Sequence, residues 1–67
     1  MLSIVVNGSV RKYGNGTTVA DLIRDLSLEG KRVAIERNGE IVPKSRHGNT
    51  PLQPGDRLEI VRAVGGG

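Results

Sequence analysis

Large aliphatic residues alternate with other residues at the start of this chain, and the alternation has the period of a strand. Every second residue of the run 2–6 is a large aliphatic, so one face of that run is predicted to be buried. The pair Asn7-Gly8 follows at once, and both residues accept the positive φ angles of a two-residue hairpin turn. Residues 9–13 are then predicted to return as a second strand, with Val10 on its inward face.

The period changes to that of a helix after the hairpin. Thr17 or Thr18 is suited to the N-cap, and Asp21, three residues after Thr18, is placed to complete a capping box. The apolar residues that follow have the spacing i, i+3, i+4 and i+7, which predicts one buried helical stripe made of Val19, Leu22, Ile23 and Leu26. The helix is expected to span residues 18–27, and Gly30 is expected to supply the left-handed residue after its end.

The strand period returns in the second half of the chain. Residues 32–36 alternate, and the pair Asn38-Gly39 predicts a second hairpin turn that leads into a short strand at residues 40–42. Pro43 is expected to end the pairing because it has no N–H to donate.

A long polar stretch separates this hairpin from the last strand. Residues 44–55 are predicted to form a loop from which Leu52 fills part of the core. The final strand is predicted to begin near Arg57, with Leu58 and Ile60 facing inward.

The order of these elements predicts an α+β fold. A mixed sheet of four to five strands, in the order ββαβββ, with one helix across a single face buries every apolar stripe. We expect the first and last strands to lie side by side in the middle of the sheet. The predicted domain spans residues 1–64, followed by a flexible glycine tail at residues 65–67.

Composition limits the chemistry that the chain can perform. There is no cysteine, and His47, which is expected at the surface, is the only histidine. A disulfide framework, a thiolate nucleophile, a Cys- or His-based metal site and a histidine-dependent triad are therefore not expected. A chain of 67 residues also has little room for a deep cleft, so we predict that it is not an enzyme.

Charge and hydropathy bear on the class of partner. The ten Lys and Arg are interleaved with seven Asp and Glu, giving a net charge of +3, and Tyr13 is the only aromatic residue. A mixed solvated surface is favoured over nucleic-acid binding, because no aromatic residues accompany the basic ones to stack on bases. The sequence has no signal-peptide pattern and no run near the ~18 apolar residues of a membrane span. We expect a cytoplasmic protein with neither a nucleic acid nor a membrane as partner.

The last residues are the strongest indication of function. Val64 is followed by Gly65, Gly66 and Gly67. Glycines form a thin, flexible segment, and three of them extend at most roughly 10 Å. Such a tail suits the insertion of a terminal carboxylate into the active site of another protein. A frayed terminus without a role is the alternative.

The pattern resembles the β-grasp, or ubiquitin-like, fold, and more narrowly the ThiS family of sulfur carriers in thiamine biosynthesis. The resemblance covers the whole chain and rests on Asn7-Gly8, Thr17–Leu22, Val33–Pro43, Gly55–Val61 and Gly65–Gly67.

The resemblance implies a carrier cycle centred on Gly67. An E1-like adenylyltransferase would use ATP to adenylate the Gly67 carboxylate, and the acyl-adenylate would accept sulfur, ultimately from cysteine through a cysteine desulfurase. The resulting thiocarboxylate would donate its sulfur to thiazole synthase. The chain itself would bind no cofactor and no metal and would supply no catalytic residue.

The ubiquitin-like comparison also suggests a docking face on the outward side of the sheet, next to the tail. The candidate residues are Val61, Ala63, Val64 and Ala34, with Arg57 and Glu59 as a charged rim. The alternative is that these are ordinary solvated surface residues.

Three other functions stay open from the sequence. A related sulfur carrier for molybdopterin or tRNA thiolation would share the adenylated glycine and differ in its acceptor. A small basic RNA-binding module and a β-grasp interaction domain without tail chemistry would both tolerate loss of the last two glycines. Deleting these glycines therefore separates the carrier from the other two classes.

Overall fold

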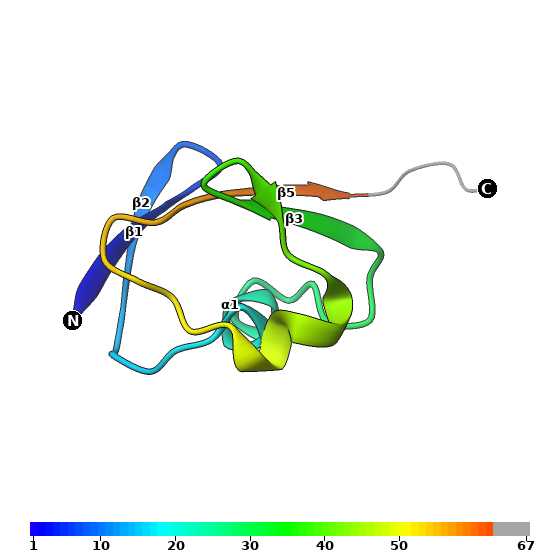
Figure 1. The fold of residues 1–67 in the computed structure, drawn as a ribbon, viewed down its shortest axis with the longest axis horizontal. Helices are drawn as coiled ribbons and strands as arrows, with labels where there is room; N and C mark the ends of the chain where they lie inside the picture. The colour runs from blue at the N-terminus through cyan, green and yellow to red at the C-terminus, as the bar shows by residue number, and fades with distance from the viewer. Residues whose placement is uncertain (63–67) are drawn as a thin grey trace.

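The computed structural model describes residues 1–62, and the predicted tail together with Ala63 and Val64 lies outside the described residues. Five strands form one mixed sheet, and both helical segments lie on the same side of it (Figure 1). The elements are β1 (Leu2–Val6), β2 (Ser9–Tyr13), α1 (Val19–Asp25), β3 (Val33–Arg37), β4 (Glu40–Ile41), the 3₁₀ helix η1 (Lys44–Asn49) and β5 (Arg57–Arg62).

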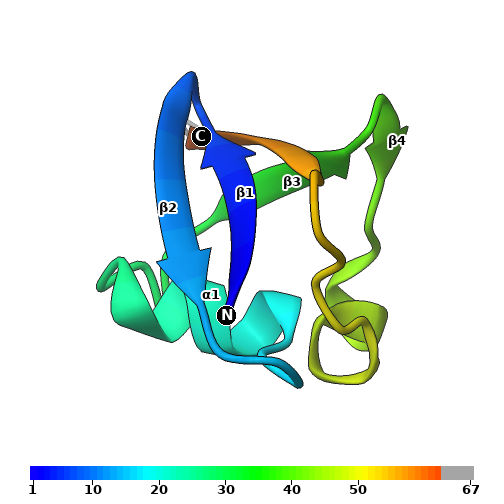
Figure 2. The ribbon, with the colours of Figure 1, turned by 90° about the vertical axis from the view of Figure 1, so that its left-hand side faces the viewer.

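The strand order of the sheet is β2-β1-β5-β3-β4. The first and last strands lie side by side in the middle, as predicted. They pair in parallel, whereas the other neighbours are antiparallel. Figure 2 shows the sheet from the side, with α1 beneath β1 and β2 and with η1 beneath β4. The predicted fold class is confirmed.

Both Asn-Gly turns are present. Asn7 and Gly8 have φ angles of 48° and 85°, and Asn38 and Gly39 have φ angles of 52° and 87°. Two consecutive positive φ angles define the turn type that matches the twist of a tight hairpin. The first turn also fixes the register between β1 and β2, in which Val5 lies opposite Val10.

This register contradicts the inward position predicted for Val10, which is 68% exposed. The buried residues of β1 are Leu2, Ile4 and Val6, so Val5 points to the opposite face, and its partner Val10 points there with it. The alternation of β2 alone could not define its inward face, because the turn sets the phase.

The helix begins as predicted and ends early. The Thr18 side chain accepts a hydrogen bond from the Asp21 backbone N–H at 3.2 Å, and the Asp21 side chain accepts one from the Thr18 N–H at 3.0 Å. The helix stops at Asp25, and Ser27 with φ 60° is the left-handed residue that closes it; Gly30 is also left-handed, as predicted, with φ 81°. The Leu28 N–H then bonds to the Ile23 carbonyl at 2.9 Å, which closes the helix and directs Leu28 back onto the core.

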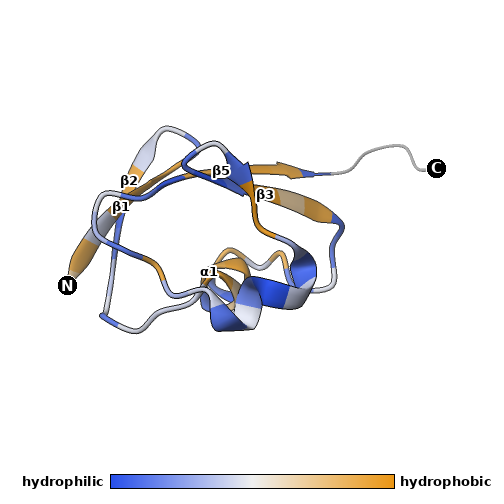
Figure 3. Cartoon of the chain, in the orientation of Figure 1, coloured by the Kyte–Doolittle hydropathy of each residue, from blue (hydrophilic) through white to orange (hydrophobic). Residues whose placement is uncertain are grey.

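The core lies between the sheet and the helical side. Nine aliphatic side chains are buried: Leu2, Ile4, Val6, Val19, Leu22, Ile23, Ile35, Leu52 and Leu58. Figure 3 shows that hydrophobic segments concentrate on the central strands and α1, whereas η1 is mostly hydrophilic. Leu52, at 2% exposure, fills the core from the connection before β5, as predicted.

The segment predicted as a loop contains η1. Pro43 precedes it in an extended conformation, and the Arg46 N–H bonds to the Pro43 carbonyl at 2.8 Å. The Thr50 hydroxyl donates to the Arg46 carbonyl at 2.7 Å at the other end. None of its residues is buried, so no apolar periodicity marks this helix in the sequence.

Candidate functional site

The strand β5 leads toward the predicted tail. On the side that faces β1, the side chain of the turn residue Asn7 continues the backbone pairing of β5. Backbone pairing with β1 covers only Val5 with Arg57 and Val6 with Leu58. Beyond that point the Asn7 side chain takes over: its Oδ1 accepts from the Ile60 N–H at 2.7 Å, and its Nδ2 donates to the Ile60 carbonyl at 3.2 Å. The sequence indicated Asn7 only as a turn residue, because a contact 53 positions away has no local pattern.

The other Asn-Gly turn fixes the beginning of β5. The Arg57 N–H donates to Asn38 Oδ1 at 2.9 Å, and Asn38 Nδ2 donates to Asp56 Oδ1 at 3.1 Å. The carboxylate of Asp56 is buried and also accepts from Arg37 Nε at 2.9 Å and from the Gln53 N–H at 2.8 Å. A buried charge is tolerated when it is paired and hydrogen-bonded in this way.

No pattern in the sequence indicated this network around Asp56. Gln53 is close to Asp56 in the sequence, but Arg37 and Asn38 come from the β3–β4 hairpin, 19 and 18 positions away. Together, Asn7, Asn38 and Asp56 hold β5 in place between its two neighbouring strands.

The predicted docking residues that are described share one face of the sheet. Glu59 and Val61 alternate with the buried Leu58 and therefore point outward, as predicted, and Val61 is 59% exposed. The register places Ala34 opposite Val61 on the neighbouring strand. Arg57, Glu59, Val61 and Ala34 are exposed and belong to what we call the outer face. The remaining predicted docking residues, Ala63 and Val64, and Gly65, Gly66 and Gly67 lie outside the described residues.

One residue of the outer face was not predicted. Glu36 on β3 lies directly opposite Glu59, so two carboxylates are adjacent across the strands. Like charges in directly opposite positions disfavour each other. The alternation of residues along β3 could have indicated that Glu36 points outward. Only the register between β3 and β5 shows that its cross-strand neighbour is another acid.

Two ionisable groups near α1 have pKa values shifted from their ordinary values. Burial, together with the hydrogen bond that the Tyr13 hydroxyl donates to Asp25 at 2.8 Å, raises the pKa of Tyr13. The hydrogen bond from the Thr18 backbone, together with the Thr18 side chain and Arg24, lowers the pKa of Asp21. Both groups belong to the structural frame around the helix rather than to the outer face.

Within residues 1–62 there is no group of three His, Cys, Asp or Glu that could hold a metal ion. In the same part of the chain, no helix is long and apolar enough to cross a membrane.

Residues 4–67 match the sequence profile of the ThiS family. The chain belongs to the ThiS family. It is 43% identical to the sulfur carrier protein ThiS of Bacillus subtilis over 63 residues, which cover 92% of this chain and 96% of that protein. The crystal structure of the thiamine biosynthesis protein ThiS from Geobacter metallireducens superposes with a TM-score of 0.83 at 26% identity, covering 98% of this chain and all of that one.

A second group of relatives consists of longer proteins. The chain is 42% identical over 66 residues to a thiazole synthase of Paramagnetospirillum magneticum and 35% identical to one of Magnetococcus marinus. It covers 98% of its own length in both comparisons but spans only 20% of the length of these two proteins. A ThiS-like region is thus part of some longer thiazole synthases.

Proposed function

We propose that this ThiS-family chain is a sulfur carrier of thiamine biosynthesis that carries sulfur on the carboxyl group of Gly67. The observation that supports this most strongly is the 43% identity with the Bacillus sulfur carrier over 96% of that protein's length. The β5 strand adds support, because it is anchored at its beginning and at Ile60 and leads toward the glycine segment.

The proposed cycle begins by activating the Gly67 carboxylate, which is a poor electrophile. An E1-like adenylyltransferase transfers AMP from ATP to the Gly67 carboxylate and releases pyrophosphate. A persulfide derived from cysteine by a cysteine desulfurase then displaces AMP, which leaves with one former carboxylate oxygen. A thiol reductant then cleaves the S–S bond of the resulting acyl disulfide, which gives the Gly67 thiocarboxylate and returns the desulfurase sulfur as a thiol. The chain acts as a co-substrate, so acid–base groups and the metal that handles phosphate belong to the partner.

Thiazole synthase is the proposed acceptor. Two thiazole synthases contain a region similar to this chain, and covalent linkage of two proteins raises their effective concentration for each other. This favours the thiazole branch over molybdopterin or tRNA thiolation as the destination of the sulfur.

The outer face is the proposed docking surface for these enzymes. Val61 and Ala34 offer a small apolar patch, and the Glu36–Glu59 pair offers concentrated negative charge beside it. A cation of the partner placed between the two carboxylates would relieve their mutual repulsion, which favours binding. Arg57 at the edge of this face would orient the partner, and Ala63 and Val64 would extend the contact along the tail.

The decisive test is the intact mass of the chain after incubation with ATP, the E1-like enzyme, a cysteine desulfurase, cysteine and a thiol reductant. We expect a gain equal to the replacement of one oxygen by sulfur, located on Gly67 by fragmentation. An unchanged mass, with an enzyme preparation that converts the Bacillus carrier in parallel, would contradict the proposal.

A further inference from the structure

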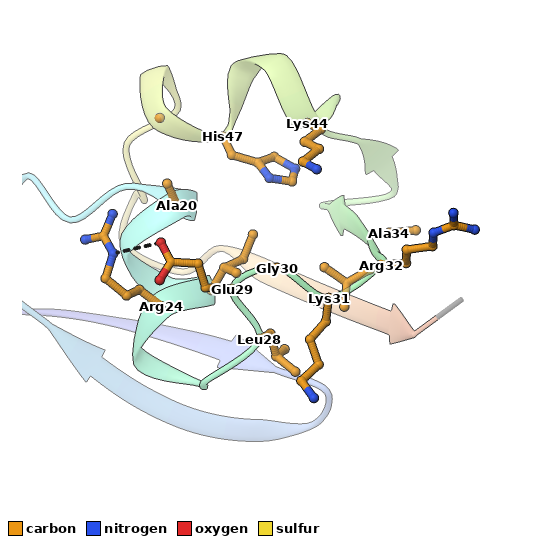
Figure 4. Close-up of a pocket in the computed structure, with 13 residues that line it drawn as sticks. Ala20, Arg24, Leu28, Glu29, Gly30, Lys31, Arg32, Ala34, Lys44 and His47 are labelled. Carbon is orange, nitrogen blue, oxygen red and sulfur yellow. Dashed lines mark ion pairs between the residues drawn. The ribbon is translucent and has the colours of Figure 1, made fainter. Parts of the chain in front are cut away.

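A groove on the helical side of the sheet is not used by the proposed carrier chemistry. It has a volume of about 490 Å³ and lies between α1, η1 and the segment that leads into β3 (Figure 4). Its apolar lining residues are Ala20, Ile23, Leu28, Val33 and Ala34. Ala20 and Ile23 lie on α1, Leu28 lies in the stretch after it, and Val33 and Ala34 begin β3.

The excess positive charge of the chain is concentrated in this groove. Four of the ten Lys and Arg line it, but only one of the seven Asp and Glu does, so the groove has a net charge of +3. The other six basic and six acidic side chains cancel. The four basic residues and the acid are Arg24, Lys31, Arg32, Lys44 and Glu29.

Three of these cations have no counter-ion in the described part of the chain. Arg24 pairs with Glu29 at 3.6 Å and with Asp21 at 3.1 Å. By contrast, Lys31, Arg32 and Lys44 form no ion pair with any described residue, and all three are exposed. Figure 4 places Lys44 and His47 on the η1 side of the groove and Lys31 and Arg32 on the side that leads to β3. The cations therefore stand on two opposite rims of an apolar floor.

The spacing of the groups favours a large ligand over a small anion. A site for a small anion gathers buried donors around one point, whereas these cations are solvated and separated by the floor. Nucleic acid is disfavoured as well, because none of the lining residues is Phe, Tyr or Trp and His47 is the one lining aromatic ring that could stack on a base. A peptide segment with carboxylates at its edges and an apolar side chain between them matches both the floor and the rims.

We propose that this groove is a second docking surface, which binds an acidic segment with interspersed apolar residues from a partner protein. The groove lies on the helical side of the sheet, whereas Glu59 and Val61 alternate with the buried Leu58 and point to the opposite side. Ala34, near the start of β3, borders both surfaces. A protein bound in the groove therefore leaves Glu59 and Val61 accessible. The chain can then be held by one protein while another acts at its outer face.

The test uses the full chain labelled with ¹⁵N and a short peptide in which glutamate and leucine alternate. We expect amide shift changes around the groove and an affinity that falls with added salt, because exposed charges are screened. A peptide with glutamine in place of glutamate should bind much more weakly, and so should one with alanine in place of leucine.

Matched variants locate the site. The double change Lys31→Glu and Arg32→Glu should weaken peptide binding by about tenfold or more, because two favourable charge contacts become repulsive. The double change Arg11→Glu and Lys12→Glu on β2 alters the net charge equally and should change the affinity less than about twofold. Ala20→Glu places a single acid in the groove at the first turn of α1, where the helix dipole favours an acid. This variant should fold normally and should also weaken binding.

Three results would overturn the proposal. One is equal weakening by the two double variants, which would indicate a response to net charge alone. Another is the absence of shift changes at the groove. The third is an oligouridylate that binds the groove more tightly than the peptide does, which would assign the groove to nucleic acid.

Discussion

The outer face and the groove differ in how their residues are brought together. Val61, Glu59, Ala34 and Glu36 belong to two neighbouring strands, and strand alternation places them on one side of the sheet. The groove takes its residues from a helix, a 3₁₀ helix and the segment leading into β3. Alternation within one strand is visible in the sequence, but the meeting of three separate segments is not. The outward direction of Glu59 and Val61 could therefore be predicted, whereas the groove was not predicted.

The two surfaces also differ in charge. The outer face carries the Glu36–Glu59 pair beside small apolar residues, whereas the groove carries unpaired cations around an apolar floor. They therefore suit partners of opposite charge, and changes on one side of the sheet should leave binding on the other side intact.

Deleting Gly67 should have the largest effect, because it should abolish the tail chemistry and leave the fold and the groove unaffected. We expect thiocarboxylate formation to be abolished, because the carboxyl group that accepts AMP would be displaced. Within residues 1–62 the buried aliphatic residues all lie between Leu2 and Leu58, so we expect the melting temperature and peptide binding in the groove to be unchanged. Intact mass, thermal unfolding and peptide titration measure the three effects. A collapse of the melting temperature would contradict this separation.

Leu58→Ala should affect both surfaces through the core that they share. Leu58 is 1% exposed, and truncating a buried leucine costs about 2–5 kcal/mol of a total of about 5–15 kcal/mol. Val61→Ala on the same strand is the control, and its cost should be less than about 0.5 kcal/mol because Val61 is exposed. Urea unfolding compares the two variants, and equal losses would show that the strand faces are assigned wrongly.

Val61→Asp should weaken docking of the E1-like enzyme on the outer face. We expect the Kd to rise about tenfold, because the change adds an acid beside the existing pair and removes an apolar contact. Val10→Asp is the matched control, since Val10 is similarly exposed on β2, at the far edge of the sheet. Calorimetric titration with the enzyme should show little effect of Val10→Asp, and peptide binding in the groove should be unchanged by both. If both valines weaken enzyme binding equally, the docking surface is not centred on β5.

The smallest expected effect concerns the capping box at the start of α1, which forms one wall of the groove. The pKa of Asp21 is lower in the folded chain than its ordinary value of 3.8. The ionised form therefore favours folding, and this contribution is fully present above 3.8 and is lost as the pH falls through the lower, folded value.

Asp21→Asn should therefore lower the melting temperature slightly at neutral pH. It should also make the melting temperature fall less steeply as the pH drops below 3.8. Thermal unfolding over a series of pH values compares the variant with the wild-type chain. Identical acid dependence of wild type and Asp21→Asn would contradict the assignment.

The elements that were predicted correctly depend on short-range rules. Asn-Gly pairs need only two residues to favour a tight turn, and the capping box needs only Thr18 and Asp21. The errors have a different origin. The inward face of β2 depends on the register across a turn, and the helix ends earlier than predicted, at the left-handed Ser27, with Leu28 returning onto the core. The helix η1 depends on backbone and hydroxyl hydrogen bonds rather than on a buried stripe.

The sequence by itself determined the order of the elements, the inward and outward faces of β5 and the family resemblance, because each is encoded in neighbouring residues or in spacing along one segment. The tertiary structure decided which distant groups meet: Asn7 with Ile60, Asp56 with Arg37 and Asn38, and Glu36 with Glu59. It also decided where the net charge lies. Basic residues that are scattered along the sequence become one cationic groove only when the chain folds, since electrostatic interactions depend on distance in space and not on separation in the chain.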